Sequence, residues 1–120
     1  MSKPVLVVDD DSAIREILEL ALADEGYDVD LAGDGVEAID KVNNKQPQLI
    51  LLDWMMPRMD GEAFADELGR RGLRPAIPIL MLTAAGNPEQ KAARIGAEGF
   101  LTKPFELPTL LDEVARLVPA

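Results

Sequence analysis

Short apolar runs, separated by segments of helical periodicity, constrain the fold of this chain more than any other feature. Three runs are apolar throughout, which is typical of strands buried on both faces of a parallel sheet. A fourth run alternates, and a fifth is brief. The five predicted strands lie at Val5–Val8, Tyr27–Ala32, Leu49–Leu52, Ile79–Leu82 and Gly99–Thr102.

The segments between these runs predict five helices. The first is expected between a cap at Asp11 or Ser12 and an end at Gly26. The other four are expected at Val36–Asn44, Glu62–Arg70, Glu89–Ile95 and Leu107–Val118. Regular alternation of strands and helices predicts an α/β fold, with one doubly wound parallel sheet and helices on both faces. The length of 120 residues is that of one domain, so we expect residues 1–120 to form it.

Composition excludes several kinds of site and partner. The chain has no cysteine and no histidine, which removes disulfides, thiolate metal sites and the commonest general base. A net charge of −10 argues against direct binding to nucleic acid or to an anionic membrane. No apolar run approaches the roughly 18 residues of a membrane-spanning helix, and the N-terminus does not resemble a signal peptide. We therefore expect a cytoplasmic protein.

Polar residues that can bind a ligand or take part in a reaction follow four of the five predicted strands. Asp9 and Asp10 come after the first strand, Asp53 after the third, Thr83 after the fourth and Lys103 after the fifth. The carboxyl ends of the strands form the edge where such folds bind ligands. Three close carboxylates need cations to stay ionised, and oxygen ligands suit Mg²⁺, with Mn²⁺ possible. A carboxylate in such a site can also attack phosphorus and form an acyl phosphate.

Three other aspartates fit ordinary structural roles. Asp34 and Asp60 each precede a glycine and are assigned to turns. Asp11 is assigned to the start of the first helix, where a negative charge suits the helix dipole.

Four segments, VLVVDDDS, LILLDWMMPRMDG, ILMLTA and FLTKPF, together resemble the receiver domain of response regulators in two-component signalling, as in chemotaxis regulators. The resemblance covers essentially the whole chain and implies the flavodoxin-like strand order 2-1-3-4-5. It implies that Asp53 is the phosphoacceptor. It also implies that Asp9, Asp10, Asp53 and the backbone carbonyl of Met55 hold Mg²⁺.

The resemblance implies a switch as well. Thr83 and Lys103 match the hydroxyl and lysine that contact the phosphoryl group, and the bond before Pro104 matches a cis peptide. Phe100 matches the aromatic that rotates inward; without a hydroxyl, its movement is a packing event. A histidine kinase or phosphotransfer protein would be the donor. A downstream protein would read the face formed by Glu89–Ile95, Gly99–Thr102 and Leu107–Val118. Self-catalysed phosphorylation and dephosphorylation would not make the protein an ordinary enzyme.

Two departures from the family pattern carry predictions. Met55 and Ala85 occupy positions where polar side chains help to orient water, so we expect slow hydrolysis of the acyl phosphate. Lys103 lies 20 positions after Thr83, fewer than the family's usual spacing, and the segment Gly86–Pro88 disfavours helix. We therefore expect a short or mobile fourth helix.

Alternative functions remain open from the sequence. A Mg²⁺-dependent phosphatase with an aspartyl nucleophile would carry a second aspartate where Met55 stands. A receiver-like module that binds partners without phosphorylation would not need the complete set of polar residues. A flavin-binding protein would need a phosphate loop unlike the DDDS segment. The chain is either a stand-alone receiver or a receiver from a longer protein.

Overall fold

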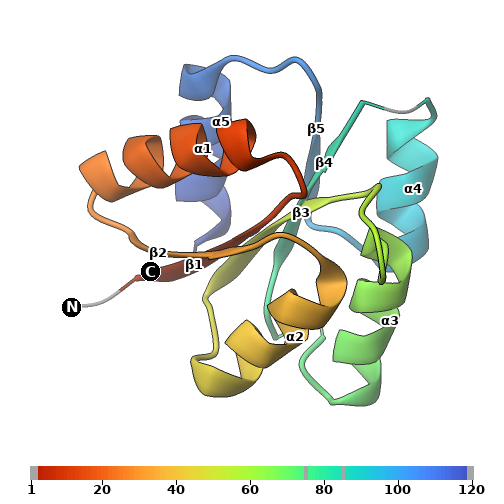
Figure 1. Ribbon diagram of the computed structural model, residues 1–120. Coiled ribbons are helices and arrows are strands. Elements are labelled where there is room, and N and C mark those ends of the chain that lie inside the picture. The colour runs from red at the N-terminus through yellow and green to blue at the C-terminus, as the bar shows by residue number, and fades with distance from the viewer. Residues whose placement is uncertain (1–2, 75, 85, 119–120) are drawn as a thin grey trace.

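A five-stranded parallel sheet runs through the centre of the molecule (Figure 1). The computed structural model describes residues 3–74, 76–84 and 86–118. The strands are β1 (Pro4–Val8), β2 (Asp28–Ala32), β3 (Leu49–Asp53), β4 (Ile79–Thr83) and β5 (Gly99–Thr102). Their order is β2-β1-β3-β4-β5, and every neighbouring pair is parallel, which confirms the predicted fold and strand order.

Five helices cover the two faces of this sheet. They are α1 (Ser12–Asp24), α2 (Gly35–Asn44), α3 (Gly61–Arg70), α4 (Pro88–Ile95) and α5 (Leu107–Leu117). Figure 1 shows α1 and α5 together on one face, and α2, α3 and α4 on the other. All five predicted helices are present, with ends that differ from the predictions by a few residues, as helix ends commonly do.

The core forms two layers because alternate side chains of a strand point to opposite faces of the sheet. Leu49 and Leu51 of β3 pack in the layer under α1 and α5, whereas Ile50 and Leu52 pack in the layer under α2, α3 and α4. All five residues of β3 are buried, as are all five of β4. The continuous apolar runs therefore arise from strands that are covered on both sides.

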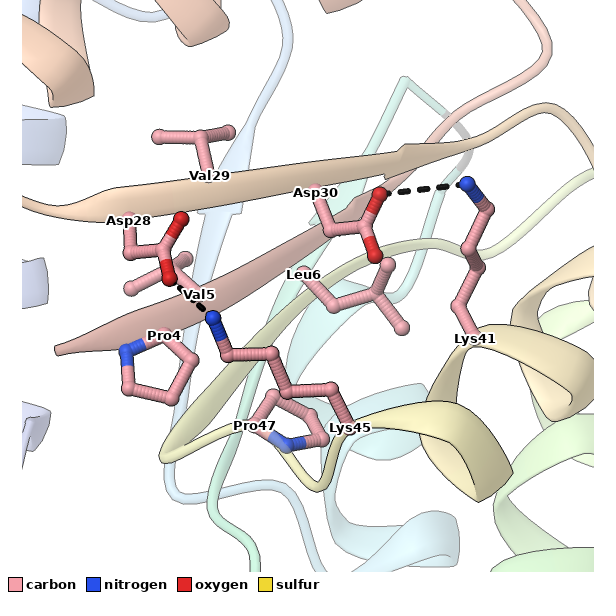
Figure 2. Close-up of a pocket in the computed structure, with 9 residues that line it drawn as sticks. All are labelled: Pro4, Val5, Leu6, Asp28, Val29, Asp30, Lys41, Lys45 and Pro47. Carbon is pink, nitrogen blue, oxygen red and sulfur yellow. Dashed lines mark hydrogen bonds and ion pairs between the residues drawn. The ribbon is translucent and has the colours of Figure 1, made fainter. Parts of the chain in front are cut away.

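Strand β2 lies at the edge of the sheet and carries two outward carboxylates. A groove of about 240 Å³ lies beside this strand. Figure 2 shows that Lys41 of α2 and Lys45, which directly follows α2, reach across it to the strand. Lys41 Nζ lies 3.2 Å from Asp30 Oδ1, and Lys45 pairs with Asp28. Charges on an edge strand oppose pairing with a second sheet. These ion pairs account for the charged residues that line the groove. The groove lies away from the carboxyl ends of β3 and β4.

Aspartates begin the first three helices. Asp11, Asp34 and Asp60 each accept a backbone N–H from the first turn of the helix that follows. The position of Asp11 at the start of α1 agrees with its predicted role. The sequence predicts turns at Asp34 and Asp60, but the two residues are the N-caps of α2 and α3, a role in which a side-chain oxygen satisfies an unpaired N–H.

Helix α4 is the shortest of the five helices in the described ranges, with eight residues. It begins at Pro88, after Asn87 in the left-handed conformation (φ 59°), and Asn87 makes no side-chain capping bond. Gly86 precedes the helix rather than belonging to it. The predicted short helix is therefore present, and Ala85 lies outside the described residues.

Candidate functional site

Three carboxylates meet at the carboxyl edge of the sheet. Strands β1, β3 and β4 are in register, with Val8 opposite Leu52 and Asp53 opposite Leu82, so their ends lie side by side. Asp9, Asp10 and Asp53 each offer an oxygen within 4.8 Å of the others. Asp9 is fully buried and Asp53 is 6% exposed, whereas Asp10 faces solvent.

Lys103 supplies a positive charge to this cluster. Its Nζ lies 2.7 Å from Asp9 Oδ2 and 3.6 Å from Asp53 Oδ1. Burial alone lowers the pKa of Lys103, but its hydrogen bond to Asp9 and the charges of Asp53 and Asp9 outweigh burial and raise the pKa above its ordinary value. The ammonium is therefore a permanent charge at neutral pH.

The carboxyl group of Asp53 has an unusual proton affinity. Burial, followed by the charges of Asp9 and Asp10, raises its pKa to about 6 against the opposing charge of Lys103. A hydrogen bond from the backbone N–H of Met55 also favours the ionised form. Perturbed carboxyl groups of this kind cluster at functional sites. Asp53 is largely ionised at neutral pH, and additional positive charge would stabilise that form.

Backbone and side-chain donors hold Asp9 in place. Its Oδ1 accepts the N–H of Asp11 at 2.9 Å, and its backbone N–H donates to Ala32 O at 3.1 Å. Arg15 Nη1 donates to the carbonyl of Asp9 at 2.6 Å. We did not identify Arg15 from the sequence. Its position one turn into the helix that follows the acidic strand end is the signal that could have found it.

The cluster suits a hard divalent cation. Carboxylate oxygens without histidine or cysteine are the donors that Mg²⁺ and Mn²⁺ prefer. Asp10 is exposed whereas Asp9 and Asp53 are buried, and one cation could bind oxygens of all three carboxylates. Met55 is 66% exposed, and a groove of about 510 Å³ between Asp10 and the loop after β3 borders this edge.

The predicted switch residues lie on β4 and at β5. Thr83 ends β4 and is 1% exposed, and its carbonyl accepts the backbone N–H of Lys103 at 2.8 Å. The peptide bond between Lys103 and Pro104 is cis. Phe100 pairs with Met81 in the sheet and is 37% exposed. Thr83 and Lys103 therefore stand together at the site, and Phe100 lies further back along β5.

One contact that the sequence does not predict links the site to α4. Trp54 directly follows Asp53, and Lys91 Nζ of α4 lies 5.6 Å from the centre of its ring. A cation over an aromatic face is attracted by the negative face of the ring. The sequence places these residues 37 positions apart, so only the fold reveals the pair.

Comparisons with known proteins agree with this architecture. The family model described as the response regulator receiver domain matches residues 5–115. Response regulator MprA of Mycobacterium tuberculosis is 44% identical over 120 residues, which are 98% of this chain and 51% of that protein. The chain thus spans about half the length of the curated relatives it matches.

Solved structures show the same fold over nearly the whole chain. Chemotaxis protein CheY4 of Vibrio cholerae superposes with a TM-score of 0.89 at 38% identity, covering 98% of this chain and 99% of that one. The receiver domain of Francisella response regulator 1452 gives a TM-score of 0.88 at 32% identity, covering 98% and 97%.

Within the described ranges, no helix is both long enough and apolar enough to cross a membrane. The strand order, the acidic edge, the family model and the relatives all indicate a receiver domain. The chain belongs to the family of response regulator receiver domains.

Proposed function

We propose that this receiver domain is a phosphorylation-dependent switch that accepts a phosphoryl group on Asp53 with the help of Mg²⁺. Response regulators receive phosphoryl groups from histidine kinases, and their receiver domains are signalling proteins rather than classical enzymes. The observation that carries the proposal is the buried carboxylate of Asp53, held among Asp9, Asp10 and Lys103 at the carboxyl edge of the sheet.

In the proposed reaction, a phosphoryl group passes from a histidine nitrogen of the donor to a carboxylate oxygen of Asp53. An oxygen of Asp53 attacks the phosphorus of a phosphohistidine on a kinase or phosphotransfer protein, forming a P–O bond. The P–N bond breaks, its electron pair stays on the imidazole nitrogen, and an acyl phosphate results. A pKa of about 6 leaves Asp53 mostly ionised at neutral pH, which is the form that attacks.

The surrounding residues offset charge during the transfer. Asp9, Asp10, Asp53 and the backbone carbonyl of Met55 would hold Mg²⁺, which when bound neutralises part of the charge on the phosphoryl oxygens. Lys103 stands between Asp9 and Asp53 and can turn its ammonium to a phosphoryl oxygen without leaving the site. Its hydrogen bond to Asp9 is then exchanged for one to the new dianion.

Phosphorylation would alter one face of the domain. The hydroxyl of Thr83 donates to a phosphoryl oxygen, and its movement frees space beside β5. Phe100, which is 37% exposed before phosphorylation, turns inward to fill that space. The surface of α4, β5 and α5 changes shape, and a downstream protein reads it.

Acetyl phosphate with Mg²⁺ provides the test. Wild type should gain the mass of one phosphoryl group, and the gain should disappear in Asp53→Asn and when Mg²⁺ is chelated. Asp60→Asn is the matched control, because asparagine also caps helices, and it should be phosphorylated like wild type. Phosphorylation of Asp53→Asn at the wild-type level would overturn the assignment.

Phosphate release, measured in the same incubation, separates the alternatives. An aspartyl phosphatase would release phosphate over many turnovers, but the thioether of Met55 has no proton to transfer where a second aspartate would stand. A module that works without phosphorylation would show no gain of mass under any condition.

A further inference from the structure

A strained turn lies in the loop 54–60, which connects β3 to α3. Arg58 has a φ of 67°, in the left-handed backbone region that residues other than glycine rarely adopt. The N–H of Met59 donates to Pro57 O at 2.7 Å, so the chain closes a three-residue turn around Arg58. Turns of this kind are rare and strained, and such strain persists only where the surroundings enforce it.

An ion pair with Asp34, the N-cap of α2, holds this turn. Arg58 Nε and Nη2 donate to Asp34 Oδ2 at 2.9 Å and 2.7 Å. The other oxygen, Asp34 Oδ1, accepts the N–H of Glu37 at 2.8 Å as the cap of α2. The hydrogen bond from Glu37 and the guanidinium of Arg58 hold the pKa of Asp34 below its ordinary value. Asp34, whose side chain is 15% exposed, is therefore a fixed anchor for the loop.

A second contact seats the loop against the same helix. A Cβ placed on Gly35 would lie 2.5 Å from Met59 O and 2.6 Å from Met59 Cβ. Only glycine allows the loop to approach the start of α2 so closely. The ion pair and this contact join the adjacent loop residues Arg58 and Met59 to the adjacent residues Asp34 and Gly35 at the start of α2.

The opposite side of the loop faces the phosphoacceptor. The N–H of Trp54 donates to Leu82 O at 3.0 Å, which ties the start of the loop to β4. Met55 lines a groove together with Asp10, one of the three carboxylates of the acidic cluster. A displacement of the loop would therefore move Met55 relative to the acidic cluster.

From these contacts we infer that Arg58 is a positioning residue for the metal site. Its pairing with Asp34 keeps loop 54–60 in the strained turn, and that loop holds Met55 where its carbonyl can bind Mg²⁺ beside Asp10 and Asp53. The inference rests on the proposed function, because it concerns the metal that the proposed function requires.

The test measures Mg²⁺ affinity through the fluorescence of Trp54, the chain's only tryptophan. Arg58→Ala and Asp34→Asn should each raise the dissociation constant for Mg²⁺ on the order of tenfold, as loss of outer contacts does at other metal sites. The double variant should lose no more than the larger single loss, because both changes break one interaction. Asp34→Asn keeps a side chain that caps α2, so its effect reports the ion pair.

Arg70→Ala is the matched control. Arg70 is 67% exposed against 62% for Arg58, and it also donates from Nε and Nη2 to one carboxylate oxygen, that of Glu67 on α3. The Arg70→Ala variant should bind Mg²⁺ with the wild-type dissociation constant. If Arg58→Ala fails to fold, Asp34→Asn alone carries the test, because it breaks the ion pair and leaves residue 58 unchanged.

The outcomes separate the inference from the proposed function. Wild-type Mg²⁺ affinity in both Arg58→Ala and Asp34→Asn, or in Asp34→Asn alone if Arg58→Ala does not fold, would overturn the role of Arg58 and leave the phosphorylation site intact. The same loss in Arg70→Ala would overturn it too, because the effect would not be specific to the loop. A wild-type protein that binds no Mg²⁺ would overturn both.

Discussion

The Nζ of Lys103 donates a hydrogen bond of 2.7 Å to Asp9 Oδ2, joining two side chains 94 positions apart in the sequence. Asp9 is fully buried, and the side chain of Lys103 is 17% exposed. One ammonium faces the carboxylates of Asp9, Asp10 and Asp53, so the edge keeps a surplus of negative charge. This imbalance underlies the first three predictions.

Replacement of Lys103 by methionine should destabilise the metal-free domain. The change leaves the buried carboxylate of Asp9 without its cation, which typically costs about 3 kcal/mol of unfolding free energy. Urea unfolding at pH 7 measures the loss. Lys41→Met is the control, because its ion pair with Asp30 is partly exposed and should contribute less than about 1 kcal/mol. Equal losses in the two variants would contradict the prediction.

Asp53 should make the metal-free domain less stable as pH rises. Its folded pKa of about 6 lies above the ordinary value, so between about pH 4 and 6 the folded state holds a proton that the unfolded chain has released. Unfolding free energy therefore falls as pH rises through this window, by roughly 2 to 3 kcal/mol.

Asp53→Asn, which cannot ionise, is the matched variant for this fall in unfolding free energy between about pH 4 and 6. In the presence of a chelator it should lack this fall and should exceed wild type in stability at pH 7. Asp60→Asn should follow the wild-type profile, because Asp60 lies outside the cluster. Parallel profiles for wild type and Asp53→Asn would show that burial of Asp53 does not control stability.

Magnesium should raise the melting temperature of the domain. A cation that binds only the folded state adds about 2.7 kcal/mol at 100 times its dissociation constant. Asp10→Asn should reduce the rise, since Asp10 offers its carboxylate from the open side of the cluster. Asp11→Asn should keep it, because asparagine can also cap α1. An undiminished rise in Asp10→Asn would remove Asp10 from the set of ligands.

The sequence predicted the fold well because each element carries its own signal. Buried strands such as β3 appear as apolar runs, and the flanking helices repeat apolar residues at helical spacing. The position of Asp53 at a strand end then follows from the strand itself. Parallel register brings strand ends together, so the gathering of Asp9, Asp53 and Lys103 at one edge could be predicted without coordinates.

Contacts between distant polar residues could not be predicted in this way. The strained turn at Arg58, its ion pair with Asp34 and the approach of Lys91 to Trp54 depend on how loops and helices lie, which periodicity does not report. Asp34 was assigned to a turn because it precedes a glycine. Glu37, three positions later, is the signal of a helix cap that could have corrected that assignment.

Addition of a methyl group at Gly35 should damage the domain. The Cβ of Gly35→Ala would overlap backbone and side-chain atoms of Met59, and we expect a loss of about 2 kcal/mol in unfolding free energy. Gly69→Ala is the control within α3. It has open space around its Cβ and should gain up to about 1 kcal/mol from helix propensity. A neutral Gly35→Ala would mean that the loop shifts freely.

The acyl phosphate on Asp53 should hydrolyse slowly, and polar side chains at positions 55 and 85 should accelerate its hydrolysis. Met55 is 66% exposed, and its thioether is a weak acceptor that orients water poorly. Met55→Asn combined with Ala85→Glu should accelerate hydrolysis by about one to two orders of magnitude, because the new groups can align or deprotonate the attacking water. Mass spectrometry after removal of the phosphodonor gives the rate. Met55→Leu, which adds no polar group, should decay like wild type, and an unchanged rate in the double variant would contradict the prediction.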